Sequence, residues 1–294
     1  MTFTRVSTRG RPAAPIALAA LLWLAPAAGA RGEEPRADAT TPPSSEEAPV
    51  LPRRAEEVVV QAVRADADTP VTRTDVPREE IEKKNAGQEM PALLASLPGM
   101  GYTSDTGLGN GYTYVSMRGM GPTRVNFTLD GAPLNEPEDS TLYFVDFADL
   151  ASSVESLQVQ RGVGTSTVGA ASFVGSINFA SIDLKDEAAA DVRLGGGSFG
   201  TGRLSAAAHS GRLGGGIKLY GQAAYQEADG FREHAGSTQQ SVYAGATRDT
   251  DTSFFKVFGF AGREQSQLAF LAADEATLDT NLRANPMSPD ERDQ

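Results

Sequence analysis

The C-terminal third of the chain alternates between apolar and polar residues. Over residues 217–225, apolar side chains such as Ile217 and Leu219 would lie on one face of an extended strand, and polar side chains such as Lys218 and Gln222 on the other. The same pattern predicts four further strands, at 192–197, 203–209, 241–247 and 255–261. Alternation over about ten residues with two unlike faces is typical of outer-membrane β-strands, although strands of a soluble β-sandwich also alternate. The length of these segments and their glycine and aromatic content favour the membrane barrel.

Residues 64–184 are predicted to form one compact domain. Apolar residues at helical spacing predict a helix over 78–97 in two pieces, broken near Gly87 and ended by Pro98-Gly99. Residues 115–134 are typical of a strand, a glycine turn, a paired second strand and a tight hairpin at Asp130-Gly131, because Asp-Gly accepts the positive φ angles of a two-residue turn. Further strands are predicted at 154–162 and 176–179. The predicted fold class is therefore an α+β domain followed by the first strands of an antiparallel transmembrane β-barrel.

The N-terminal segments are predicted to serve export and tethering. Basic residues through Arg11, an apolar run over 16–24 and small residues at 28–30 predict a secretory signal peptide over 1–30. Residues 31–55 are rich in Pro, Glu, Ala, Thr and Ser and are predicted to be a disordered linker. The valine-rich segment 56–63 favours an extended chain. It is either the first strand of the next domain or a free strand offered to the sheet edge of a partner.

Composition narrows the possible functions. The chain of 294 residues has a formal net charge of −12, which argues against a nucleic-acid partner. It has no cysteine and only two histidines, His209 and His234, so neither a thiolate metal site nor a zinc cluster nor a catalytic triad is expected. Asp146 and Asp149 could form a carboxylate pair, but they are interpreted as solvated or capping residues. We therefore expect no enzyme activity, no metal site and no cofactor.

Four motifs follow one another along the chain. They are, in order, Glu57–Ala62, Met90–Gly99, Met117–Leu134 and Val154–Asn178. In this order, and after a signal peptide, they resemble the N-terminal part of the TonB-dependent outer-membrane receptors of the siderophore or iron-complex type. The chain departs from the family at Gly162-Val163 and Val168-Gly169, where Gly-Pro and Tyr-Gly are common.

The resemblance implies a plug domain inside a barrel of about 22 strands and import driven from the inner membrane. The segment 56–63 would be the TonB box, and the residues that would bind TonB are Glu57, Val58, Val59, Val60, Gln61 and Ala62. Arg118 and Arg124 would lock the plug to acidic residues of the barrel wall, and Tyr112 and Tyr114 would contact substrate at a plug apex. The implied partners are TonB with its inner-membrane energising complex, outer-membrane lipid, and an iron chelate or similar small ligand. The implied location is the outer membrane of a Gram-negative cell.

The number of predicted strands limits what the chain is expected to do. The strands of residues 185–294 are too few to close such a barrel, and residues 271–294 are typical of a polar external loop. An open sheet edge in lipid leaves backbone groups unpaired, at several kcal/mol each. The sequence therefore predicts a fragment that does not transport by itself. An alternative of another class is a periplasmic or envelope interaction module without transport activity. Siderophore, haem, cobalamin and saccharide all stay open as substrates, and an iron chelate is favoured because most of the family imports iron.

Overall fold

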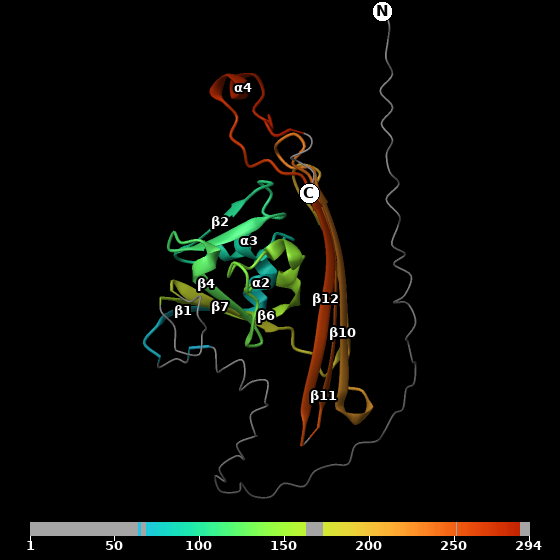
Figure 1. Cartoon of the computed structure of the whole chain (residues 1–294). Helices are drawn as coiled ribbons and strands as arrows, with labels where there is room; N and C mark the ends of the chain where they lie inside the picture. The colour runs from blue at the N-terminus through green and yellow to red at the C-terminus, as the bar shows by residue number, and fades with distance from the viewer. Residues whose placement is uncertain (1–63, 66–68, 163–172, 251, 289–294) are drawn as a thin grey trace, which may run out of the picture. The chain divides into compact units, whose positions relative to one another are not determined.

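The computed structural model describes residues 64–65, 69–162, 173–250 and 252–288. The predicted signal peptide, linker and TonB box lie outside the described residues. Within these ranges, no helix is both long and apolar enough to cross a lipid bilayer. The described chain forms an α+β domain (residues 64–184) and a sheet of five long strands, β8–β12 (Figure 1).

A mixed five-stranded sheet forms the centre of the α+β domain. Its strands, in spatial order, are β1 (Thr72–Pro77), β6 (Val154–Arg161), β7 (Gly175–Ser181), β4 (Val125–Leu129) and β5 (Ala132–Pro133). Strands β4 and β7 are parallel, and the other neighbours are antiparallel. The predicted hairpin at Asp130-Gly131 joins β4 to β5, with φ of 48° and 82° at the two residues.

Two short helices pack their apolar side chains into the core of this domain. The helix predicted over 78–97 occurs in two pieces, α2 (Arg78–Lys84) and α3 (Met90–Leu94), with Gly87 at φ 103° between them. The core contains the fully buried side chains of Ile81, Leu94, Phe127, Phe144 and Leu157, among others. Phe127 and Phe144 meet edge to face at 5.6 Å. Burial of each such side chain contributes about 1.5–3 kcal/mol.

The interpretation of residues 115–129 as one strand pair is wrong. Strand β3 (Thr113–Met117) pairs instead with β2 (Met100–Ser104) in a separate two-stranded sheet. Arg118 and Gly119 both have positive φ, 52° and 80°, and the 3-10 helix η1 (Pro122–Arg124) follows them. This turn directs the chain away from β3 and into the central sheet, where β4 pairs with β7 and β5.

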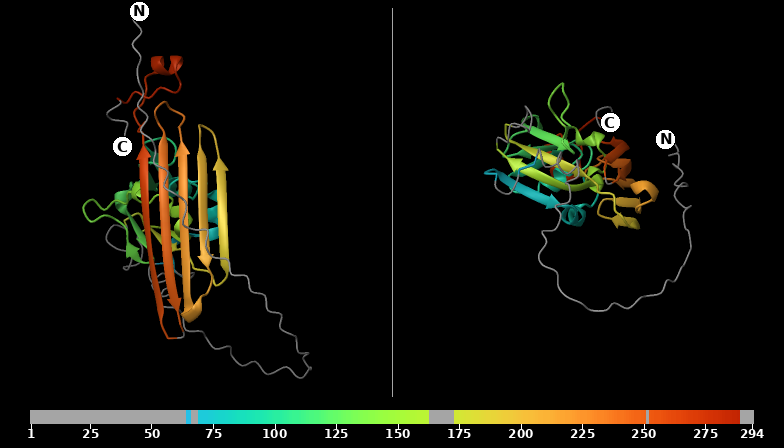
Figure 2. Two further views of the ribbon diagram at one scale, coloured as in Figure 1. Left: turned by 90° about the vertical axis from the view of Figure 1, so that its right-hand side faces the viewer. Right: turned by 90° about the horizontal axis from the view of Figure 1, so that it is seen from below.

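The C-terminal sheet is an antiparallel meander. Its strands are β8 (Ala188–Gly196), β9 (Gly202–Ser210), β10 (Ile217–Ala228), β11 (Ser237–Asp249) and β12 (Phe254–Ser266). Each strand pairs with the next one along the chain, as Figure 2 shows face-on. All five predicted strands occur and are longer than predicted. At one end of the sheet, called here the loop end, lie residues 197–201, residues 229–236 and the stretch after β12. That stretch contains a short helix, α4 (Glu275–Thr280), which the sequence analysis missed.

The β8–β12 sheet buries its polar face and exposes its apolar face. Lys218 and Gln222 are 5% and 8% exposed, whereas Leu194 and Phe255 are 81% and 64% exposed. A soluble sandwich would show the opposite distribution, because apolar burial stabilises its core. This distribution is typical of the strands of a transmembrane barrel wall, whose apolar side chains point outward.

Candidate functional site at the interface of the α+β domain and the β8–β12 sheet

The polar face of the sheet contacts the α+β domain through a buried ion pair. Arg203 of β9 places Nη2 2.8 Å from Oδ1 of Asp149, and the two side chains are 11% and 7% exposed. Asp149 precedes the 3-10 helix η3 (Leu150–Ser153) with φ of 56° and makes no capping hydrogen bond. Asp146 is exposed, as expected. For Asp149, however, the interpretation as a solvated or capping residue is wrong, because its carboxylate is buried against the sheet.

Hydrogen bonds from both parts of the structure satisfy this ion pair. Ser152 Oγ donates to Asp149 Oδ1 at 2.8 Å, and Gln222 Nε2 of β10 donates to Oδ2 at 3.2 Å. Arg203 also donates to Ser152 Oγ at 3.0 Å and to Asn85 Oδ1 at 3.2 Å. Burial raises the pKa of the Asp149 carboxyl, while Arg203 and Ser152 act in the opposite direction. A buried charge pair is tolerated when its remaining polar atoms are bonded in this way.

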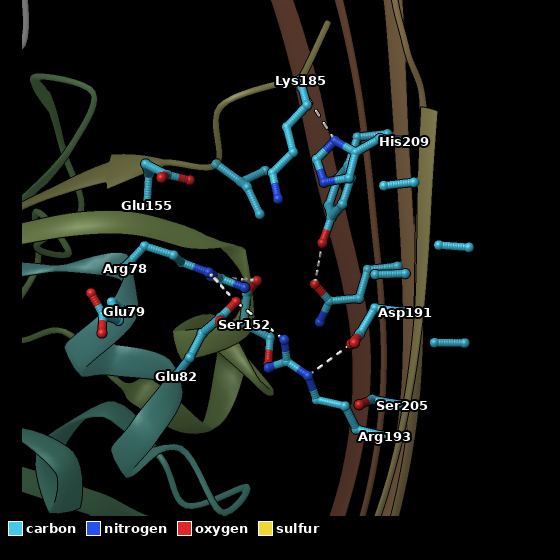
Figure 3. Close-up of a pocket in the computed structure, with 17 residues that line it drawn as sticks. Arg78, Glu79, Glu82, Ser152, Glu155, Lys185, Asp191, Arg193, Ser205 and His209 are labelled. Atoms are coloured by element: carbon cyan, nitrogen blue, oxygen red, sulfur yellow. Dashed lines mark hydrogen bonds and ion pairs between the residues drawn. The ribbon is translucent and has the colours of Figure 1, made fainter. Parts of the chain in front are cut away.

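A polar pocket of about 340 Å³ lies between helix α2 and strands β8–β10 (Figure 3). Arg193 of β8 bridges to Asp191 at 2.7 Å and across the pocket to Glu82 of α2 at 3.2 Å. Burial opposes ionisation of Glu82, but its contacts with Arg78 and Arg193 outweigh burial and lower the pKa of its carboxyl. Positive and negative side chains from both parts of the structure thus line the pocket.

The pocket is also lined by His209 and Tyr220. The rings of His209 and Tyr220 contact each other in a tilted arrangement, with their centres 4.5 Å apart. No nucleophile is bonded to His209 in the structure as described. In the described ranges, no group of three or more His, Asp or Glu residues is placed to hold a metal ion.

The two arginines predicted to lock the plug are exposed. Arg118 follows β3, and its backbone N–H donates to Gly99 O at 2.7 Å. Arg124 lies with its guanidinium 5.8 Å from the centre of the Phe173 ring. Neither side chain forms an ion pair with another described residue. Their role as a lock to acidic wall residues stays a prediction.

The two tyrosines predicted to contact substrate lie near the loop end of the sheet. Tyr114 is on β3 and Tyr112 is on the preceding loop, and both are part-buried. Burial, together with the nearby Asp105, raises the pKa of the Tyr114 hydroxyl. The same loop bonds to the stretch after β12, where Ala269 N–H donates to Asp105 O at 2.7 Å. The predicted contact with substrate stays a prediction.

Comparison with known proteins gives one family and a set of solved structures. Residues 65–176 match the model of the TonB-dependent Receptor Plug Domain. The ferric citrate transporter FecA in its unliganded form superposes with a TM-score of 0.60 at 16% identity, over 74% of this chain and 34% of that one. The ferric yersiniabactin uptake receptor FyuA from Yersinia pestis gives 0.56 at 17% identity, over 76% and 36%. The pyoverdine outer membrane receptor FpvA from Pseudomonas aeruginosa PAO1, bound to pyoverdine, gives 0.55 at 19% identity, over 68% and 28%.

The solved structures belong to chains much longer than this one. The chain spans about a third of their length or less. At such identities the likeness shows the fold of the α+β domain and of the β8–β12 sheet. None of the proteins of curated function matches the chain significantly.

Proposed function

We propose that this chain serves TonB-dependent import of an iron chelate across the outer membrane, within a barrel that further strands would close. The match to the plug domain model, followed by strands like those of the receptor barrels, supports this proposal. The observation that carries this proposal is the inverted β8–β12 sheet. Its apolar face is exposed, and its polar face is joined to the plug domain by the buried Asp149–Arg203 pair. A plug held to a wall by polar contacts can move without exposing an apolar core.

Energy would enter through the segment 57–62, captured by TonB as an added strand. Just after this segment, Arg64 donates to the backbone oxygens of Ser156 at 3.0 Å and Asn178 at 3.1 Å. Ala65 and Gln158 exchange two hydrogen bonds, of 2.7 and 3.1 Å. These contacts lie on β6 and β7, in the interior of the central sheet. A pull on the TonB box would therefore apply force to strands β6 and β7, in the middle of the plug.

The predicted site residues fit this function in three places. Glu57, Val58, Val59, Val60, Gln61 and Ala62 would form the TonB-binding strand. Arg118 and Arg124 would meet acidic residues on a wall surface outside the β8–β12 sheet. Tyr112 and Tyr114 would face an arriving iron chelate, because their loop lies at the loop end of the sheet.

The test replaces Val59 by proline in the gene in its native cell. Proline removes the backbone N–H that strand addition needs, so uptake of radiolabelled ferric chelate should fall to background while binding to de-energised cells is retained. Val50→Pro is the matched control, because it lies upstream of the box, and it should leave uptake unchanged. Uptake that survives Val59→Pro would refute the assignment of the box.

Cell fractionation separates this function from an interaction module without transport. The import proposal requires the chain in the outer-membrane fraction, extracted only by detergent. Recovery of the chain as a soluble periplasmic protein would favour the interaction module instead.

A further inference from the structure

A second junction between the α+β domain and the β8–β12 sheet lies at the loop end. Glu89, the residue before α3, is 3% exposed. One of its carboxyl oxygens accepts a hydrogen bond from Gly111 N–H at 2.9 Å, and the other accepts one from the hydroxyl of Thr113. Glu264 of β12 lies against the same loop, because a Cβ added at Gly111 would come within 3.0 Å of Glu264 Oε1.

The loop of residues 105–112 is held closely to the sheet at this junction. Gly111 has φ of +67°, and an added Cβ would lie 2.8 Å from Ser266 Cβ and 2.8 Å from Thr106 Cγ2. The backbone bond from Ala269 N–H to Asp105 O adds a second attachment. Only glycine allows this approach at position 111.

Among the residues that the structure describes, no positively charged side chain pairs with either of the two carboxyl groups. Glu89 and Glu264 both lie against Gly111: Glu89 accepts its N–H at 2.9 Å, and Glu264 Oε1 lies 3.0 Å from where a Cβ at Gly111 would be. Neither has a salt-bridge partner among the described residues. Glu264 Oε2 accepts from Gln239 Nε2 at 2.6 Å, while its buried Oε1 has no donor within the described part of the chain.

The other ionisable side chains at this junction are those of Asp105, Tyr112, Tyr114 and Arg232. Arg232, on the loop before β11, is bonded to the backbone oxygens of Ala269 and Leu271. Two carboxylates in contact cannot both ionise cheaply, and a hydrogen bond between them requires one proton.

Burial and the negative charge of Glu264 raise the pKa of Glu89 to about 8. Hydrogen bonds from Thr113 and Gly111 oppose this increase without cancelling it. Glu89 therefore keeps its proton at neutral pH for as long as the junction is closed.

We propose that Glu89 and Glu264 share one proton and form a latch that holds loop 105–112 against the loop end of the sheet. In the closed latch, the Glu89 carboxyl O–H donates to Glu264 Oε1. When the loop lifts, Glu89 is solvated and its proton passes to water. This inference concerns the junction alone, so it holds or fails independently of the import function.

The latch predicts a particular pH profile. Glu89 has a pKa of about 8 when closed and an ordinary value of 4.5 when solvated. Opening should therefore become about tenfold more favourable per pH unit from about 5.5 to 7.5. Above about pH 8 the profile should become level, because the closed form then also loses its proton.

Thiol labelling of the full chain in detergent micelles measures this opening. The chain has no cysteine, so Asn110→Cys places a single thiol on the buried side of the loop, where Asn110 is 2% exposed. Thr103→Cys, at an exposed position on β2, corrects for the pH dependence of the thiol itself. The ratio of the two labelling rates should rise about a hundredfold between pH 5.5 and 7.5. Hydrogen exchange at Gly111 N–H provides the same measurement without a new cysteine.

Matched variants decide the outcome. Glu89→Gln keeps the hydrogen-bonding shape without an ionisable proton, so it should flatten the profile. Glu264→Gln removes the neighbouring negative charge but leaves Glu89 buried, so the rise should level off at a lower pH than in the parent chain. Glu155→Gln, a part-buried carboxyl near the cations Arg78 and Lys185, should leave the profile unchanged. A flat profile in the parent chain, or an equal rise in Glu89→Gln, would overturn the latch. So would opening that follows calcium or EDTA at constant pH, because a cation would then join the two carboxylates.

Discussion

Asp149→Asn tests the ion pair that joins the α+β domain to the β8–β12 sheet. The substitution removes one charge and keeps the side-chain shape, and asparagine accepts the left-handed backbone at φ 56°. At the observed 2.8 Å, the attraction is about 6 kcal/mol for an effective dielectric constant of about 20. Desolvation offsets part of this attraction in the parent chain. In the variant, Arg203 stays buried without its counter-charge, so we expect a loss of roughly 3–5 kcal/mol.

Amide hydrogen exchange in detergent micelles measures this loss where it occurs. A loss of 3 kcal/mol or more corresponds to at least about a hundredfold faster exchange at residues 150–153. Asp146→Asn, an exposed carboxylate three residues earlier, is the control and should change stability by less than about 0.5 kcal/mol. Adding Arg203→Met should recover part of the loss, because it removes the unpaired charge. Additive effects of Asp149→Asn and Arg203→Met, within about 0.5 kcal/mol, would refute the coupling.

Three further predictions concern the α+β domain. Arg64→Ala should weaken the attachment of the chain to β6 and β7 and speed amide exchange at Ala65 N–H at least tenfold, because a lost buried hydrogen bond costs about 1–3 kcal/mol. Unchanged exchange would show that Arg64 does not attach the chain there. Gly175→Ala should lower the free energy of unfolding by about 1–3 kcal/mol, because the new Cβ would lie 2.1 Å from Gln160 O. Gly121→Ala is the control and should have little effect, because the space around Gly121 is open. The free energy of unfolding should fall as the pH rises from 5 to 8. In this range Glu89, whose pKa is raised to about 8 in the folded chain, binds more protons when folded than when unfolded. The slope should be up to about 1.4 kcal/mol per pH unit, and Glu89→Gln should remove it.

Periodicity predicted the strands of the β8–β12 sheet because each strand has two unlike environments. The alternation at 217–225 reflects an exposed apolar face on one side and the α+β domain on the other, so the pattern survives in the sequence. Strand β1 was not predicted, because TRTDVP has little apolar character and is held mainly by backbone pairing with β6. The partners of β3 and β4 were also missed, because pairing depends on where the turn at Arg118 and Gly119 sends the chain.

The candidate site was harder to predict than the fold. Motif order pointed to Arg118 and Arg124, which are exposed, whereas the buried ion pair uses Asp149 and Arg203. The sequence did contain a signal for Arg203, because this residue begins the strand predicted at 203–209. Its partner could not be found in the same way, since Asp149 lies on an irregular segment with no periodicity.

The charges on the buried face of the β8–β12 sheet follow a simple rule with one exception. Four cations on this face meet carboxylates: Arg193 with Glu82 at 3.2 Å, Arg203 with Asp149 at 2.8 Å, Lys218 with Asp186 at 2.9 Å, and Lys256 with Asp130 at 3.8 Å. In each of these pairs a cation meets a carboxylate of opposite charge. Glu264 reverses the rule, because the residue it meets is Glu89. The pairs of Arg193, Arg203 and Lys256 join the sheet to the α+β domain, so charge pairing holds most of this interface. The proposed latch would add a shared proton at the loop end, so pH should release this end before the rest.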